Sequence, residues 1–329
     1  MALTILRHES DLLRDNPCGD PHEREVWVYT PPGYEDSKRR YPVLWCLVGY
    51  SGTGAMAVTG NRWSPGLPDR LDGLIAAGAC EPVIVAFPDC FTRWGGSQYV
   101  NSAAQGPYED YVCNELVPLV DERFRTVAER GSRGVFGKSS GGYGALRFAM
   151  RRPDLFGAAA SHSGDVGFAF CYLPTFADTI AAIQARGSIE ELVEAFESHE
   201  KKQDFIAMCT LGMAASYSPD PAAPFGFRLP FDLETGELLT DVWAEWKRFD
   251  PAEMMLEKRY DDALRGLKLL FLDCGTKDEW HLQCGLRLFA GRLDAAGIAY
   301  ELEEFADTHR SISYRYDVSL PKLAAAVAS

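Results

Sequence analysis

The fold can be predicted from one stretch of the sequence, Gly137-Lys138-Ser139-Ser140-Gly141-Gly142. It matches the pattern G-x-S-x-G, follows the short apolar run 134–137 and precedes a helical pattern from about Ser140 to Arg152. A strand that turns sharply into a helix at such a motif is a nucleophile elbow, where small neighbours let strand and helix approach closely. The motif therefore predicts an α/β fold in which Ser139 is a catalytic nucleophile.

Two other interpretations of this stretch compete with the elbow. Gly-Lys-Ser also occurs in phosphate-binding loops, but the Walker A pattern needs a glycine at position 132, where this chain has Ser132. A glycine-rich packing turn is the second alternative, and it would leave Ser139 without a purpose. Ser161 and Ser163 are weaker nucleophile candidates, because no G-x-S-x-G pattern frames them.

Before and after the elbow, short apolar runs alternate with helical patterns. The runs predicted as strands are residues 25–29, 43–48, 82–87, 134–137, 158–161, 267–272 and 299–302. Helices are expected at 109–124, 140–152 and 281–296, the last of them ended by Gly297. Such alternation produces a parallel sheet between helices. The predicted fold class is α/β, with a mostly parallel central sheet and helices on both faces.

The segment from about Asp165 to Asp250 breaks this alternation. It has helical patterns at 189–196 and 204–215 and a loop-like stretch at 217–224, so we interpret residues 165–250 as a cap-like insertion within a single domain, residues 1–329. Its aromatic residues exceed what a linker needs: Phe168, Phe170, Tyr172, Phe176, Trp243 and Trp246. Most should pack the insertion onto the sheet, and some should line an apolar acyl or aryl pocket.

A catalytic serine needs a base and an acid that orients it, and in this type of fold they follow in the order acid, then histidine. Of the six histidines, only His309 follows the last predicted strand, so it is the expected base. Asp278 is the favoured acid, because it lies in the loop after the strand ending at Leu272. The alternatives are Asp273, Glu279 and Asp307.

The oxyanion of an ester-cleaving reaction needs backbone N–H donors. We expect them at Ser140, which follows the nucleophile, and at Tyr50, in the loop after the strand 43–48. Substrate-binding residues are expected at Trp94, His162 and Trp280, of which His162 ends the strand 158–161. No metal and no cofactor is expected, because the histidines form no HExxH motif and the cysteines show no zinc spacing.

Composition narrows the class of protein further. Lysine and arginine number 33 against 47 acidic residues, a net charge of −14, which disfavours binding to nucleic acid or to an anionic membrane. No apolar run approaches the roughly 18 residues of a membrane span, and residues 1–16 carry charges where a signal peptide would be apolar. Nine cysteines without CxxC spacing favour reduced thiols. We expect a cytoplasmic protein that binds a small molecule rather than nucleic acid or a membrane, and a homo-oligomer is compatible with the sequence.

Together these segments resemble the Putative esterase family of α/β-hydrolases, the group of esterase D, feruloyl esterases, enterochelin-esterase-like proteins and mycolyltransferases. The resemblance spans about residues 24–325 except the insertion. The segments that carry it are residues 41–44, 49–52, 95–102, 106–111, 115–116, 137–146, 274–278, 304–305 and His309. It places nucleophile, acid and base on Ser139, Asp278 and His309. Two departures, Val48 where the family often has histidine and Ser140 where it often has methionine, remove no catalytic group.

The resemblance implies an α/β-hydrolase fold and a serine carboxylesterase that forms an acyl-enzyme. Acyl transfer with the same triad is the nearest alternative, and cleavage of amides is a third. A non-catalytic binding module is the alternative from another class of protein. The segments around the active site of S-formylglutathione hydrolases are not closely reproduced, so that substrate is not supported.

Overall fold

The computed structural model describes residues 2–61, 63–200 and 204–328. Its centre is an eight-stranded sheet in the order β1-β2-β4-β3-β7-β8-β9-β10. These strands are β1 Ala2–Glu9, β2 Glu23–Thr30, β3 Val43–Leu47, β4 Ile84–Pro88, β7 Arg133–Lys138, β8 Ala158–His162, β9 Leu269–Gly275 and β10 Glu301–Phe305. β1, β2 and β4 pair antiparallel, and every pair from β4 to β10 is parallel. The predicted, mostly parallel α/β sheet is confirmed.

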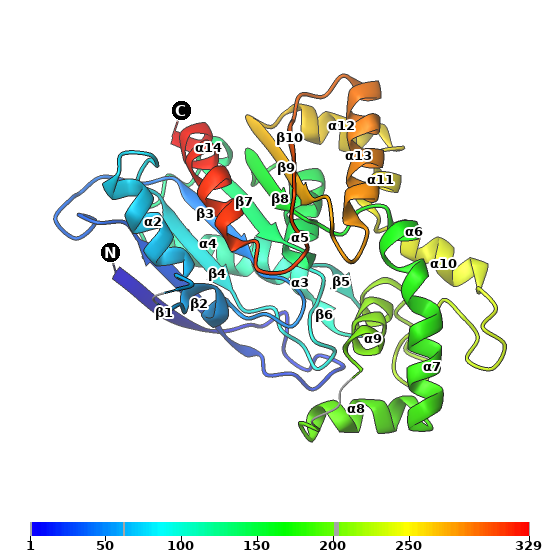
Figure 1. Ribbon diagram of the computed structural model, residues 1–329. Helices are drawn as coiled ribbons and strands as arrows, with labels where there is room; N and C mark the ends of the chain where they lie inside the picture. The colour runs from blue at the N-terminus through cyan, green and yellow to red at the C-terminus, as the bar shows by residue number, and fades with distance from the viewer. Residues whose placement is uncertain (1, 62, 201–203, 329) are drawn as a thin grey trace.

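Helices cover both faces of this sheet (Figure 1). The helices packed on one face are α1 Gly54–Val58, α2 Leu67–Ala76 and α14 Tyr316–Ala328. On the other face lie α3 Tyr108–Asp110, the π-helical turn Tyr111–Leu116, α4 Val117–Arg123, α5 Ser140–Arg151 and α13 Leu282–Ala296, with α11 Pro251–Met254 and α12 Lys258–Arg265 packed on α13 and α5. Short 3₁₀ turns span Arg130–Ser132, Leu173–Thr175 and Ser313–Arg315. Among the described residues, no helix is long and apolar enough to cross a membrane.

The central strands are fully buried, and the outer ones are not. All five residues of β3 and of β8 are buried, which explains their continuous apolar runs. β1 and β10 are the two edges, and most of their side chains are at least partly exposed. The sequence prediction missed β1, because none of its eight residues is buried and it has no apolar run. It also placed the last strand two residues too early.

The first part of the segment between β8 and β9 forms helices that lie together beside the sheet (Figure 1). They are α6 Phe168–Cys171, α7 Phe176–Arg186, α8 Ile189–Glu197, α9 Phe205–Tyr217 and α10 Thr240–Lys247. The two predicted helices correspond to α8 and α9. Every residue of α9 from Ala207 onward is buried, so this helix is the core of the segment. A small hairpin, β5 Asn101–Ser102 with β6 Gly106–Pro107, packs against α9.

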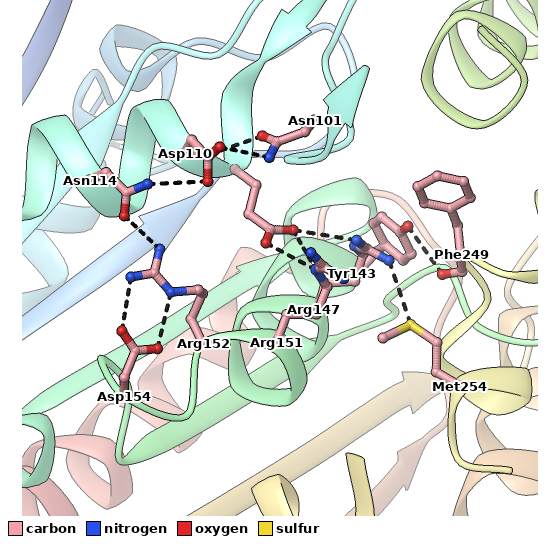
Figure 2. A network of polar contacts seen from close by, with 11 residues as sticks. Asn101, Asp110, Asn114, Tyr143, Arg147, Arg151, Arg152, Asp154, Phe249 and Met254 are labelled. Carbon is pink, nitrogen blue, oxygen red and sulfur yellow. Dashed lines mark hydrogen bonds and ion pairs between the residues drawn. The ribbon is translucent and has the colours of Figure 1, made fainter. Parts of the chain in front are cut away.

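A polar network fixes α5, the helix that follows the elbow (Figure 2). The side chain of Glu109 is buried and accepts hydrogen bonds from Arg151 Nε, at 2.8 and 2.9 Å, and from Arg147 at 3.4 Å. One turn earlier in α5, the Tyr143 hydroxyl donates to the carbonyl of Phe249 at 3.1 Å. These contacts hold α5 against α3 and against the end of the α10 segment, so the helix behind the elbow has little freedom to move.

Candidate active site

Ser139 sits at a strained turn between β7 and α5. Its φ is 58° and its ψ is −128°, a conformation that costs free energy in any residue with a side chain. A Cβ on Gly137 would lie 2.3 Å from the carbonyl oxygen of Leu47, and one on Gly141 only 1.9 Å from the same atom. The glycines of the motif are thus required by the close packing of β3, β7 and α5, as a nucleophile elbow demands.

His309 connects this serine to a buried carboxylate. Its Nε2 lies 3.0 Å from Ser139 Oγ, and its Nδ1 lies 2.8 Å from Oδ2 of Asp278. The Asp278 side chain is fully buried, and its Oδ1 accepts the backbone N–H of Trp280 at 2.9 Å. With an acceptor on Nδ1, the imidazole carries its proton there and leaves Nε2 free to accept one from the serine.

The three alternative carboxylates lie elsewhere. Asp273 is inside β9 and pairs with His162 and Arg315. Glu279 accepts the backbone N–H of His309 at 2.7 Å and so supports its loop without touching the ring. Asp307 accepts from the backbone of Thr308. Of these candidates, the structure brings only Asp278 to the imidazole ring.

Tyr50 and Ser140 lie beside Ser139, and both line the same cavity. The backbone N–H of Ser140 is the first in α5, where a helix offers it no internal acceptor. On either side of Tyr50 the loop is fixed, because Ser51 N donates to Gly95 O at 2.8 Å and Gly52 N to Gly49 O at 3.0 Å. The Tyr50 hydroxyl lies 2.6 and 2.9 Å from two backbone oxygens, those of Trp94 and Met208.

A cavity of about 370 Å³ opens onto Ser139 and His309. Much of its wall is apolar and comes from the insertion and from the β9–α13 loop: Cys171, Tyr172, Phe205, Met213, Trp280 and Leu282. Of the six aromatic residues singled out in the insertion, Tyr172 lines this cavity, and the cluster around Trp246 packs behind it. Trp280, which was predicted to bind substrate, also lines this cavity.

A second cavity, of about 640 Å³, continues from the first. The two share Cys171, Thr175, Phe205, Trp280 and Arg310, so they form one groove. The residues that line the second part include the acidic Asp178, Asp204 and Glu279. The groove is thus apolar near the serine and acidic farther out.

Two predicted substrate-binding residues do not line this groove. His162 is 1% exposed, and both ring nitrogens are bonded, Nδ1 to Asp273 and Nε2 to Ser319, each at 2.8 Å. Successive side chains of a strand point to opposite faces, and His162 faces α14 rather than the elbow. Trp94 is buried edge-on against Phe227, with ring centroids 5.0 Å apart. The expectation that His162 and Trp94 line the site is wrong for these reasons.

Three charged residues of the cavity wall were not predicted: Lys138, Asp165 and Arg310. Lys138 precedes the nucleophile, and burial lowers the pKa of its ammonium group, although Asp278 and Glu279 act in the opposite direction. Asp165 follows β8, and burial raises the pKa of its carboxyl group. The signal for Asp165 was present, because polar residues after the carboxyl end of a parallel strand often belong to the site.

Across residues 2–61, 63–200 and 204–328, no group of three or more histidine, cysteine, aspartate or glutamate side chains is arranged to hold a metal ion. The polar groups that line the cavity include the Ser139 hydroxyl, the His309 imidazole and the Asp165 carboxyl group.

Comparison with known proteins identifies the family of this chain. The model of the family described as Putative esterase matches residues 21–318. The chain belongs to the Putative esterase family. Esterase Rv1288 of Mycobacterium tuberculosis is 30% identical over 215 residues, which cover 60% of this chain and 43% of that protein. The chain thus spans less than half the length of this curated relative.

Solved structures show the same fold at lower sequence identity. A ferulic acid esterase superposes with a TM-score of 0.65 at 18% identity, covering 99% of this chain and 98% of that one. An S-formylglutathione hydrolase from Agrobacterium tumefaciens gives a TM-score of 0.58 at 19% identity, covering 99% and 95%. This member of the Putative esterase family therefore has the α/β-hydrolase fold, as its sequence motifs predicted.

Proposed function

We propose that the protein is a serine carboxylesterase that hydrolyses carboxylic esters, acyl or aryl, through an acyl-enzyme intermediate. One observation carries the proposal: His309 lies 3.0 Å from Ser139 Oγ through one ring nitrogen and 2.8 Å from Asp278 through the other. A hydroxyl, an imidazole and a buried carboxylate in this order form the apparatus of acyl transfer to a serine. Membership in a family of esterases supports the same conclusion.

In the first half of the reaction, His309 Nε2 takes the proton of Ser139 as its oxygen attacks the ester carbonyl. The imidazolium that forms is stabilised by the carboxylate of Asp278. The backbone N–H groups of Tyr50 and Ser140 bind the negative oxygen of the tetrahedral intermediate. His309 then gives the proton to the departing alcohol, and the acyl group remains on Ser139.

In the second half, His309 activates a water molecule that attacks the acyl-enzyme, and the acid product leaves. The apolar wall formed by Tyr172, Met213 and Leu282 suits an acyl group, because ester sites bury apolar substrate against such side chains. The wider, acidic part of the groove lies beyond Trp280 and Arg310 and has room for the alcohol portion.

We also propose that residues 165–250 are a cap inserted into one domain and that the protein is cytoplasmic. The strands before and after this segment, β8 and β9, pair directly with each other, which supports an insertion. All nine cysteines are free thiols, and seven of them are buried, which is typical of a reducing compartment.

The test of the proposed function combines activity with labelling. Ser139→Ala and His309→Ala should each lower kcat on short 4-nitrophenyl esters by up to about 10⁶, and the double variant should be scarcely worse than either. A fluorophosphonate probe should label the unmodified protein at Ser139, and equally the controls Ser161→Ala and Ser163→Ala. Labelling that persists in Ser139→Ala, or losses that multiply in the double variant, would contradict the assignment.

A further inference from the structure

Asp165 is a buried carboxylate in the wall of the active-site cavity that the mechanism above does not use. It is 7% exposed and lies beside Ser140, whose Oγ donates to it at 3.3 Å. Two further donors reach it from the β4–β5 connection and from the insertion. The Tyr172 hydroxyl lies 2.9 Å away and the Gln98 amide nitrogen 3.2 Å away. Three segments of the chain therefore converge on this one side chain.

All three donors bind the same oxygen. Ser140, Tyr172 and Gln98 each donate to Oδ2, and within the described parts of the chain no hydrogen bond reaches Oδ1. Oδ1 is not one of the buried side-chain atoms that lack a partner, so it is reached from the cavity and can accept a hydrogen bond there. Because Asp165 lines the cavity, the donor can come from a bound substrate.

The charges of the cavity decide between two kinds of donor. Among the residues that the structure describes, no cationic group lies within 4 Å of Asp165, so an ammonium group of a substrate would find an opposite charge. Lys138 and Arg310, however, line the same cavity and would repel that cation. A hydroxyl group donates a hydrogen bond without bringing a charge, and it therefore fits this wall better.

The position of His309 indicates which part of the ester reaches Asp165. The departing oxygen must face Nε2 of His309, because that nitrogen protonates it. Arg310, the residue after His309, lines both cavities, so the groove continues from the histidine loop into the acidic cavity. Tyr172, Met213 and Asp165 line only the inner cavity, so this wall is available to the acyl group.

We propose that Asp165 is a specificity-determining residue that accepts a hydrogen bond from a hydroxyl group on the acyl part of the ester, so that the preferred substrates are esters of hydroxylated acids. This inference rests on the proposed esterase function. The raised pKa of the Asp165 carboxyl group agrees with a site whose charged oxygen is incompletely solvated before substrate binds.

The test compares matched pairs of esters that differ by one hydroxyl. The probes are 4-nitrophenyl hexanoate with its 6-hydroxy derivative, and 4-nitrophenyl 3-phenylpropanoate with its 2-, 3- and 4-hydroxyphenyl derivatives. For the unmodified protein, kcat/KM should be higher for at least one hydroxylated member by about ten- to a hundredfold, as a hydrogen bond to a charged group permits. In Asp165→Asn this ratio should fall close to one.

Asp250→Asn is the matched control. Asp250 is a second buried carboxylate whose pKa is raised by burial, but it binds backbone N–H groups of Gly167, Phe168 and Ala252 and does not line the cavity. The control should keep the wild-type ratio. If the unmodified protein hydrolyses both members of every pair equally, or if Asp165→Asn keeps the ratio, the inference is overturned while the esterase function stands. Absence of turnover with all of these esters would instead overturn the esterase function, and the inference with it.

Discussion

Asp278 meets the imidazole of His309, although other carboxylates stand close to it in sequence. Its two oxygens are both engaged, one by the ring and one by the Trp280 amide, so the side chain has a single orientation. Glu279, its neighbour, supports the backbone of His309 instead. Two adjacent residues of one loop thus have different contacts. Asp278 bonds the imidazole ring of His309, and Glu279 bonds the backbone N–H of the same residue.

Replacing Asp278 with asparagine should reveal this division. The amide leaves the fold intact but favours the wrong imidazole tautomer, so kcat should fall on the order of 10⁴. Asp307→Asn should cost far less, because Asp307 binds Thr308 and Tyr314 and not the ring. Steady-state kinetics on a short ester distinguishes the two. If Asp307→Asn were the crippling change and Asp278→Asn mild, the acid would belong to the histidine's own loop.

The buried charge of Asp165 should also affect stability. In the unfolded chain this carboxyl group ionises near its ordinary pKa of 3.8, whereas burial raises its pKa in the folded protein. As the pH rises above about 4, the unfolded chain loses the proton first, and the folded state loses stability by about 1.4 kcal/mol for each unit of difference. Asp165→Asn lacks this titration. Urea unfolding between pH 4 and 7 should show the variant gaining stability relative to the wild type, and a constant or falling difference would refute this.

The residues of the site differ in how well the sequence could predict them, because some are positioned by local motifs and others by contacts distant in sequence. Ser139, Asp278 and His309 follow strand ends in a fixed order, so sequence alone could predict that they lie together, as the structure has them. His162 also ends a strand, yet the face to which its side chain points depends on strand register and on α14, which joins it through Ser319 from 157 residues away. Such distant pairings leave no local signal in a single sequence.

At the scale of elements, contacts of backbone against backbone hold the site together. Helix α13 shows this at Gly285, where an added Cβ would lie 1.7 Å from the carbonyl oxygen of Val166. Val166 directly follows Asp165, so this helix determines where the start of the insertion runs. Gly291 in the same helix has no atom within 4 Å of its Cβ position.

These two glycines of one helix should respond in opposite ways to alanine. Gly291→Ala should stabilise the protein by about 0.4–1 kcal/mol, because it lowers the entropy of the unfolded chain without a clash. Gly285→Ala must displace α13 or the loop at Val166, so it should lower both stability and ester turnover. Thermal unfolding and kcat/KM on one ester would measure both effects. Equal behaviour of the two variants would show that the close contact at Gly285 has no consequence.

Elements with a strong pattern were predictable, and those at the margins were not. Continuous apolar runs identified β3, β7 and β8, because these strands are buried on both faces. β1 escaped the prediction because it lies at the sheet edge and all of its residues are at least partly exposed. Its pairing with β2 depends on a register of eight residues that composition does not reveal.

At the scale of the whole molecule, the insertion and the sheet are joined at the site itself. The Tyr50 hydroxyl links the loop beside the nucleophile to Met208 in α9, and its ring packs edge-on against Phe205 at 5.7 Å. Tyr50 therefore connects the loop after β3 to the wall of the cavity that the insertion forms. Substrate selectivity should accordingly depend on the part of the insertion that faces this loop.

Two aromatic residues of the insertion should have different effects. Tyr172→Ala enlarges the cavity and should shift the preferred acyl length, with each methylene changing selectivity by about 1–3 kcal/mol. Trp246 is fully buried behind the cavity, so Trp246→Ala should cost about 3–5 kcal/mol of stability and leave the length profile unchanged. The measurements are kcat/KM across acyl lengths and urea unfolding. A profile that Tyr172→Ala leaves unaltered would place the acyl pocket elsewhere.

Strand β10 forms an open edge of the sheet, and its charged side chains protect this edge from pairing with another strand. Glu301, Glu303 and Glu304 stand on this five-residue strand, and their carboxylates pair with Lys322, Arg315 and Arg287 of the same chain. A foreign strand that added to this edge would have to strip water from these charges or break their pairs. The edge should therefore resist the edge-to-edge pairing of strands that leads to aggregates. The protein can thus keep an exposed strand beside the loop that carries His309.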